Sequence, residues 1–172
     1  TERMRRGRLA KLRAGILLPW THAPYGYCPH PDRPRDPCGL TLDPGAAAVV
    51  SEIFARYLEP GVGLLQVAGL LRDRQTPSPT GKTFWGLATV RGILTNPVYT
   101  GQVYAGRTRY RPARIRRSAT HPIGRPHDTA IAAPSAEWIP VATVPVIVSQ
   151  DEFDRVQGKL AKNRTFARRH NT

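Results

Sequence analysis

The stretch from Lys82 to Gly101 constrains the fold of this chain more than any other part of the sequence. Its apolar residues recur at the spacing of an amphipathic helix, with one buried stripe, at Leu87, Val90, Ile93 and Leu94. Asn96-Pro97 should end this helix, because the residue before a proline is pushed out of the α region. Residues 98–104 then alternate in polarity, which predicts a strand.

The side of the predicted helix that faces away from the apolar stripe carries no carboxylate. Its residues are small, hydroxylic or cationic: Ala88, Thr89, Arg91 and Thr95. Threonine and arginine side chains in such a position can reach phosphates and base edges in a DNA groove. Helix, break and strand together are typical of a winged or helix-turn-helix-like domain, and a surface helix of any basic domain is the alternative from this stretch alone. The connection over residues 75–83 is longer than a strict helix-turn-helix allows, which favours the winged variant.

The charge balance indicates a polyanionic partner. The 172 residues include 26 Lys and Arg against 12 Asp and Glu, so the net charge is +14, and the isoelectric point is near 11.0. Nucleic acid is favoured over an anionic membrane as this partner, because no apolar run approaches the roughly 20 residues that span a bilayer. The first residues also lack the apolar segment of a signal peptide. We therefore expect no membrane contact and a cytoplasmic, nucleoid-associated location.

The remaining pattern predicts a mainly helical α+β domain. Asp43 and Pro44 are a helix cap and a first helical residue, and apolar stripes predict helices up to Leu58 and over residues 63–74. The Ser149–Glu152 segment is a capping box for a last helix. Residues 138–148 are expected to form strands beside 98–104, and a short hairpin is expected around residues 36–40. We thus predict a helical bundle of winged or helix-turn-helix-like character, a small antiparallel sheet and a C-terminal helix.

A strongly basic segment follows the predicted strand. It carries Arg107, Arg109, Arg111, Arg114, Arg116, Arg117 and Arg125, and no acid occurs between Asp73 and Asp128. On a strand, the alternating first three arginines would share one face. Beyond them, prolines and small residues up to Ser135 predict a mobile loop. Phosphate contact is favoured over a merely soluble basic loop.

Neither a metal site nor a catalytic site emerges from the sequence. The two cysteines, Cys28 and Cys38, lie near His22 and His30, but the spacing matches no common zinc pattern, and reduced thiols are expected over a metal site or a disulfide. The acids are scattered, and Gly61-Val62-Gly63 lacks the glycine and lysine of a phosphate-binding loop. The chain is therefore expected to bind rather than cut, without cofactor or metal.

Four blocks of the sequence, in order, resemble the recombinase domain of large serine recombinases, the family of serine integrases and related transposases. The blocks are Ala23–Tyr27, Asp43-Pro44 with the helix after it, Trp85 to Gly101, and Ile147 to Gln157. The third block matches at Trp85, Thr89, Val90, Arg91, Ile93, Leu94, Asn96, Pro97, Tyr99 and Gly101. The resemblance covers residues 8–160.

The resemblance implies sequence-specific binding of duplex DNA half-sites by the middle domain of a site-specific recombinase. This domain would position a catalytic serine domain that lies upstream of residue 1. Residues 1–20 would form a basic connector helix, 21–163 the DNA-binding domain with its basic loop at 107–136, and 164–172 a linker to a further domain. Contacts with other recombinase subunits would be made by those missing domains, and the isolated fragment would be monomeric.

The predicted DNA contacts fall into two sets. The helix and the residues before it supply Lys82, Thr83, Thr89, Arg91 and Thr95; the basic segment supplies Arg107, Arg109, Arg111, Arg114, Arg116 and Arg117. Two other function classes remain open, a stand-alone winged-helix DNA-binding regulator and a basic RNA-binding protein. The RNA alternative would have only Tyr99, Tyr104 and Tyr110 to stack on bases.

Overall fold

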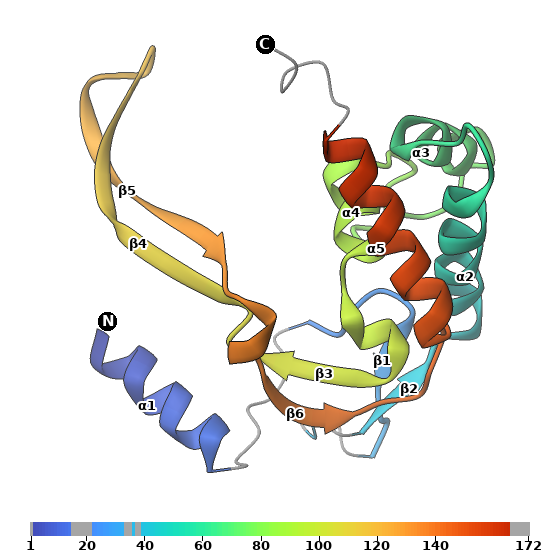
Figure 1. Ribbon diagram of the computed structural model, residues 1–172, viewed down its shortest axis with the longest axis horizontal. Helices are drawn as coiled ribbons and strands as arrows, with labels where there is room; N and C mark the ends of the chain where they lie inside the picture. Colours follow the sequence, from blue (N-terminus) through green and yellow to red (C-terminus); the bar gives the residue numbers. More distant parts are fainter. Residues whose placement is uncertain (1, 15–21, 33–35, 37–38, 166–172) are drawn as a thin grey trace. The chain divides into compact units, whose positions relative to one another are not determined.

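A computed structural model describes residues 2–14, 22–32, 36 and 39–165. The chain divides into two compact units, each built from two separate segments (Figure 1). The larger combines Pro19–Val103 with Ala142–Thr172, and the smaller combines Thr1–Leu18 with Tyr104–Val141. Among the described residues, no helix is long and apolar enough to cross a membrane.

The described residues of the larger unit form four α-helices: α2 (Pro44–Leu58), α3 (Leu64–Asp73), α4 (Leu87–Leu94) and α5 (Gln150–Thr165). The start of α2 is as predicted, since the Asp43 carboxylate accepts the N–H groups of Gly45 and Ala46 at 3.1 Å each. At the start of α5 the Ser149 hydroxyl accepts the N–H of Glu152 at 3.2 Å. These local caps fix where α2 and α5 begin.

The core of the larger unit lies where α2 contacts the other three helices (Figure 1). Its largest fully buried side chains include Phe54, Tyr57, Leu71, Leu94 and Tyr99. The Phe54 ring meets Tyr99 edge-on at 6.1 Å and Phe153 at 6.2 Å. Burial of each large apolar side chain contributes about 1.5–3 kcal/mol to folding, so this cluster holds the helices in one arrangement.

A short antiparallel pair precedes the helices. Strand β1 (Tyr27–Pro29) pairs with β2 (Leu40–Leu42) in the register Tyr27↔Leu42. The predicted hairpin around residues 36–40 is therefore wrong in extent, because its first strand lies well upstream. The Tyr27 hydroxyl donates to the carbonyl of Pro145 at 2.7 Å and lies 3.2 Å from that of Val98, which ties β1 to two distant segments.

The strand predicted over residues 98–104 is only half correct. A 3-10 turn, η1 (Pro97–Thr100), comes first, and only Gln102–Ala105 (β3) is extended, paired with β6 (Ile139–Thr143). Proline fixes its own φ near that of a helical turn, which favours η1. Gly101 follows with φ +91°, and a Cβ there would lie 2.8 Å from Val146 Cγ2. Gly101 therefore permits a turn that other residues would strain.

The smaller unit contains helix α1 (Glu2–Arg13) and a long antiparallel hairpin of β4 (Thr108–Ser118) and β5 (His121–Ala132). The loop predicted beyond Arg111 up to Ser135 is thus wrong, because most of this segment is extended and paired. Prolines disfavour a central strand, but a two-stranded hairpin has only edge strands, which tolerate them. The pairing shifts between Arg111 and Arg114, around Pro112, as expected where a proline interrupts a ladder. A 3-10 turn, η2 (Ser135–Glu137), follows β5.

Candidate nucleic-acid interface

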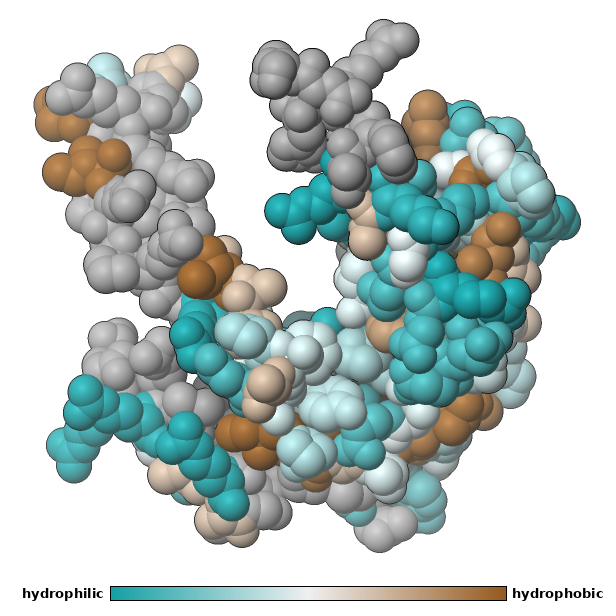
Figure 2. Space-filling model, in the orientation of Figure 1, coloured by the Kyte–Doolittle hydropathy of each residue, from teal (hydrophilic) through white to brown (hydrophobic). Residues whose placement is uncertain are grey.

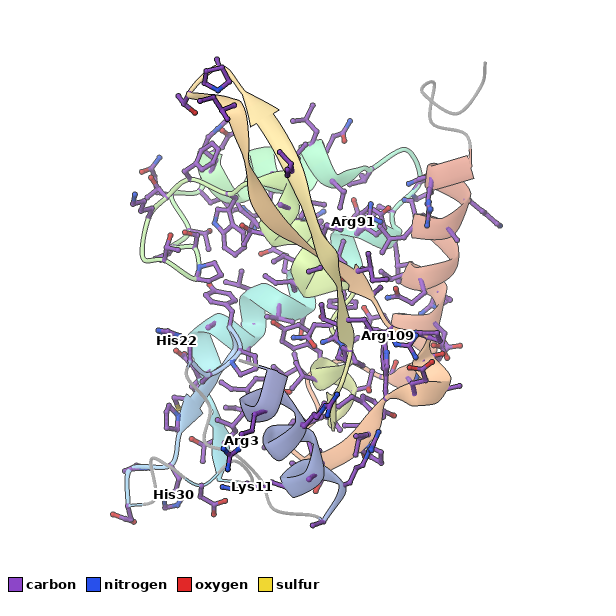
Figure 3. All side chains as sticks on the ribbon, turned by 90° about the vertical axis from the view of Figure 1, so that its left-hand side faces the viewer. Arg3, Lys11, His22, His30, Arg91 and Arg109 are labelled. Carbon is purple, nitrogen blue, oxygen red and sulfur yellow. The ribbon has the colours of Figure 1, made fainter. Side chains whose placement is uncertain are left out.

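Helix α4 presents a rigid outward face. Val90, Ile93 and Leu94 are buried, and Thr89 is half-buried. Arg91, which is labelled in Figure 3, is exposed. Trp85, just before the helix, is 3% exposed, and its indole N–H donates to the carbonyl of Thr76 at 2.9 Å. The predicted role of Trp85 as a core residue is confirmed. Arg91 therefore projects from a helix that is fixed on its opposite side.

The end of α4 uses one of the predicted contact residues for its own structure. The Thr95 hydroxyl donates to the carbonyl of Arg91 at 2.9 Å, and the Thr95 N–H donates to the same carbonyl at 3.0 Å. A DNA contact by this hydroxyl would have to compete with that bond. Thr95 thus stabilises the helix that carries Arg91.

Lys82 and Thr83 lie in the connection between α3 and α4, and both side chains are exposed. The backbone of this connection is held, because the N–H of Ser78 donates to the carbonyl of Lys82 at 2.7 Å. Ser78 is buried, at 6% exposure. The connection consequently displays a lysine and a hydroxyl directly before α4.

An apolar patch that the sequence pattern does not predict lies beside these residues. Leu65, Phe84 and Leu87 are 69%, 70% and 46% exposed, and they border a shallow pocket of about 370 Å³ that also involves Arg72 and Trp85. The prediction that Leu87 faces the core is wrong, because Leu87 is the first residue of α4 and precedes the buried stripe. The adjacent Phe84 and Trp85 were the available signal, since neighbouring side chains in an extended segment point to opposite sides.

The base of the hairpin holds two of the predicted arginines. The Arg107 guanidinium carbon lies 5.1 Å from the centre of the Trp138 ring, a cation–π contact, and burial lowers the pKa of Arg107. The indole of Trp138 donates to the carbonyl of Ala133 at 3.0 Å, and Tyr104 lies 5.6 Å from its ring. Arg109 forms an ion pair with Glu137. Arg107 thus stabilises the hairpin base, while Arg109 is half-exposed.

The other predicted arginines follow along β4. The register places Arg111 opposite Thr129, Arg114 opposite His127 and Arg116 opposite Arg125. The outer part of the hairpin also exposes Ile115 (72%) and Ile123 (91%), and apolar side chains are visible there in Figure 2. The sequence of this hairpin therefore concentrates positive charge, and the two isoleucines described on its outer part are exposed.

The predicted residues fall into two groups. Those of the α4 region belong to the larger unit, and those of the 107–117 segment belong to the smaller one.

The described residues contain no group of three His, Cys, Asp or Glu side chains suited to a metal ion. Four residues were considered for zinc from the sequence. His22 and His30 are labelled in Figure 3, the Cys28 sulfur lies 3.2 Å from the Thr41 hydroxyl, and Cys38 falls outside the described residues. The dispensability of metal stays a prediction.

These features define a basic, helix-based domain with a charged β-hairpin. The Recombinase family model matches residues 44–163, and the chain belongs to this family, as the recombinase domain of large serine recombinases. The resemblance found in the sequence is thereby confirmed, as is the α+β fold class. No curated protein gives a significant match.

Two solved structures share the fold. "Crystal Structure of a LSR-DNA Complex" matches with a TM-score of 0.52 and 17% identity over 95% of this chain and 39% of that one. "Sequence Requirements of the Listeria innocua prophage attP site" matches with a TM-score of 0.51 and 18% identity over 93% of this chain and 52% of that one. The chain thus spans about half, or less, of the length of these proteins.

Proposed function

We propose that this chain binds duplex DNA sequence-specifically, as the half-site-binding domain of a site-specific serine recombinase. The observation that carries the proposal is the outward face of α4, where Arg91 and Thr89 project from a helix buried on its other side. A base contact requires a side chain held by a rigid element. Lys82 and Thr83 would bind phosphate at the entry to this helix.

The hairpin arginines would hold the DNA backbone. Arg109 to Arg117 lie along one strand, and attraction to phosphates tolerates a range of side-chain positions. The seven arginines from Arg107 to Arg125, with no acid between Asp73 and Asp128, support this role. The exposed Phe84 and Leu87 could add apolar contacts to thymine methyl groups beside α4.

In the whole recombinase, this domain would place a separate catalytic serine domain on its DNA site. That serine would attack a phosphodiester, hold the broken strand as a phosphoserine link and release it on rejoining. The residues of this chain would bind and position DNA and would not themselves cleave it. The solved neighbours include a DNA complex, which supports the choice of partner.

A salt titration of the purified chain tests the proposal. If about six phosphates are neutralised, log K should fall against log salt with a slope near −5. A duplex RNA of matched length and a supercoiled plasmid serve as controls. A slope near zero, a preference for RNA, or nicking of the plasmid by the pure chain would contradict the proposal.

A further inference from the structure

Glu137 is a carboxylate inside the most basic part of the sequence. Asp128 and Glu137 are the only acids between Asp73 and Asp151. The Glu137 side chain is 42% exposed, and it pairs with Arg109, whose side chain is 54% exposed. An acid at such a position lowers the positive field that the neighbouring arginines create.

The position of this carboxylate is fixed by its backbone. Glu137 ends the turn η2, where its N–H donates to the carbonyl of Pro134 at 3.0 Å. The next residue, Trp138, donates from its N–H to the carbonyl of Ser135 at 3.1 Å, and its ring supports Arg107. The N–H of Ala133 donates to the carbonyl of Arg107 at 2.9 Å, which closes the hairpin base. Backbone hydrogen bonds before and after Glu137 in the chain therefore fix its backbone near the hairpin base, beside Arg109.

The ion pair itself contributes little to folding. A half-exposed pair of this kind is typically worth about 0–1 kcal/mol, because water screens it. A phosphate offers the same guanidinium a similar charge-assisted contact. Arg109 can therefore exchange the carboxylate for a phosphate at small cost in folding energy, but the carboxylate then remains close to the phosphate and repels it.

We infer that Glu137 is a specificity-determining residue, which occupies Arg109 as a mimic of phosphate and so restrains binding to DNA of arbitrary sequence. This inference rests on the proposed function. On random DNA, phosphate contacts supply essentially all of the binding, and the chain can shift along the duplex to give a freed Arg109 a partner. On the cognate half-site the base contacts fix the register, so a freed Arg109 gains less.

The test is a double-mutant cycle of Glu137→Gln and Arg109→Ala on cognate and scrambled duplexes at several salt concentrations. Glu137→Gln should raise affinity for the scrambled duplex by about three- to tenfold, steepen the salt slope by about one unit and lower the ratio of cognate to scrambled affinity. In the Arg109→Ala background, Glu137→Gln should have no such effect.

Glu59→Gln is the matched control. Glu59 is 46% exposed and pairs with Arg56 at 2.9 Å in the larger unit, called the helical unit below. Glu59→Gln therefore removes the same charge as Glu137→Gln. The inference is overturned if Glu137→Gln behaves like Glu59→Gln, weakens binding, or keeps its gain without Arg109. Melting curves of Glu137→Gln and Glu137→Ala accompany the titration, and loss of the fold in both would also overturn it, since the carboxylate would then be a structural tie. Failure of the wild-type chain to bind duplex DNA would instead contradict the proposed function.

Discussion

The helical unit and the hairpin differ in what holds them in place. In the helical unit, Ile53, Phe54, Val90 and Leu94 have no exposed surface, and the rings of Tyr27 and Tyr99 stack at 6.1 Å. On the outer part of the hairpin, Ile115 and Ile123 are largely exposed. Burial of apolar side chains holds the helical unit together, whereas the hairpin is held mainly by backbone pairing between β4 and β5.

This difference suggests a division of roles on DNA. A base edge offers hydrogen bonds in fixed directions, so the residue that contacts it needs a rigid support such as α4. Phosphates offer charge over a long, repetitive surface, which a basic strand can follow without a fixed side-chain geometry. If this comparison holds, substitutions in the two units should change different measurable quantities.

The largest expected effect compares truncations in the two units. Leu94→Ala should lower the free energy of unfolding by about 2–5 kcal/mol, because it leaves a cavity in the buried helix contact. Ile123→Ala should change it by no more than about 0.5 kcal/mol, because Ile123 is 91% exposed. Urea denaturation of both variants measures this. Comparable losses in the two would mean that the outer hairpin is part of the cooperative core.

The next effect concerns sequence discrimination. Arg91→Ala should weaken binding to the cognate half-site by about 1–3 kcal/mol and binding to scrambled DNA much less, because it removes a side chain from the rigid face of α4. Competitive titration on both duplexes gives the ratio. Equal weakening on both would show that α4 does not contact bases, and the specificity would then have to come from the hairpin or from α1.

A double substitution in the hairpin should show the opposite behaviour. Arg116→Ala with Arg117→Ala should weaken cognate and scrambled binding alike and reduce the salt slope by about one to two units. The unfolding free energy should change little, because the substitutions leave the backbone pairing of β4 with β5 in place. A change in the cognate-to-scrambled ratio would contradict the division of roles.

The sequence predicts the helical unit well because its signals are local. Asp43 and Pro44 start α2, and Asn96-Pro97 ends the region of α4, each through interactions within a few residues. Trp85 was expected in the core and is buried. Helix periodicity does not, however, tell which residue of the first turn faces inward, and this is why Leu87 was misassigned.

The hairpin is harder to predict because its pairing is not local. Thr108 pairs with Ala132, and the prolines within both strands resemble loop signals until the partner strand is known. The Arg109–Glu137 and Arg107–Trp138 contacts likewise join residues that no sequence period relates. The charge pattern predicts the arginines as DNA contacts, whereas the contacts that Glu137 and Trp138 make with two of them are evident only in the structure.

The smallest expected effect tests whether the stability of the helical unit is separable from its charge. Burial raises the pKa of Tyr27 to about 12, and its hydroxyl donates to the carbonyl of Pro145. Tyr27→Phe should cost about 1 kcal/mol at neutral pH, because the hydroxyl is lost and buried carbonyl acceptors are left unpaired. The salt slope of DNA binding should not change, since no charge is altered at that pH.

The same variant has a characteristic pH dependence. The folded state of the wild type keeps the Tyr27 phenol protonated above the unfolded pKa of about 10, so its stabilising contribution is complete below that pH and is lost as the pH rises towards 12. Tyr27→Phe should therefore lose stability less steeply than the wild type over this range, while Tyr25 and Tyr99, whose pKa values are also raised by burial, still contribute to the loss. Urea titrations at pH 7, 9.5 and 11 follow both curves. Parallel curves would show that the Tyr27 hydroxyl is solvated in the folded protein. Its hydrogen bond to the Pro145 carbonyl, which joins β1 to the segment before α5, would then not contribute to the stability of the helical unit.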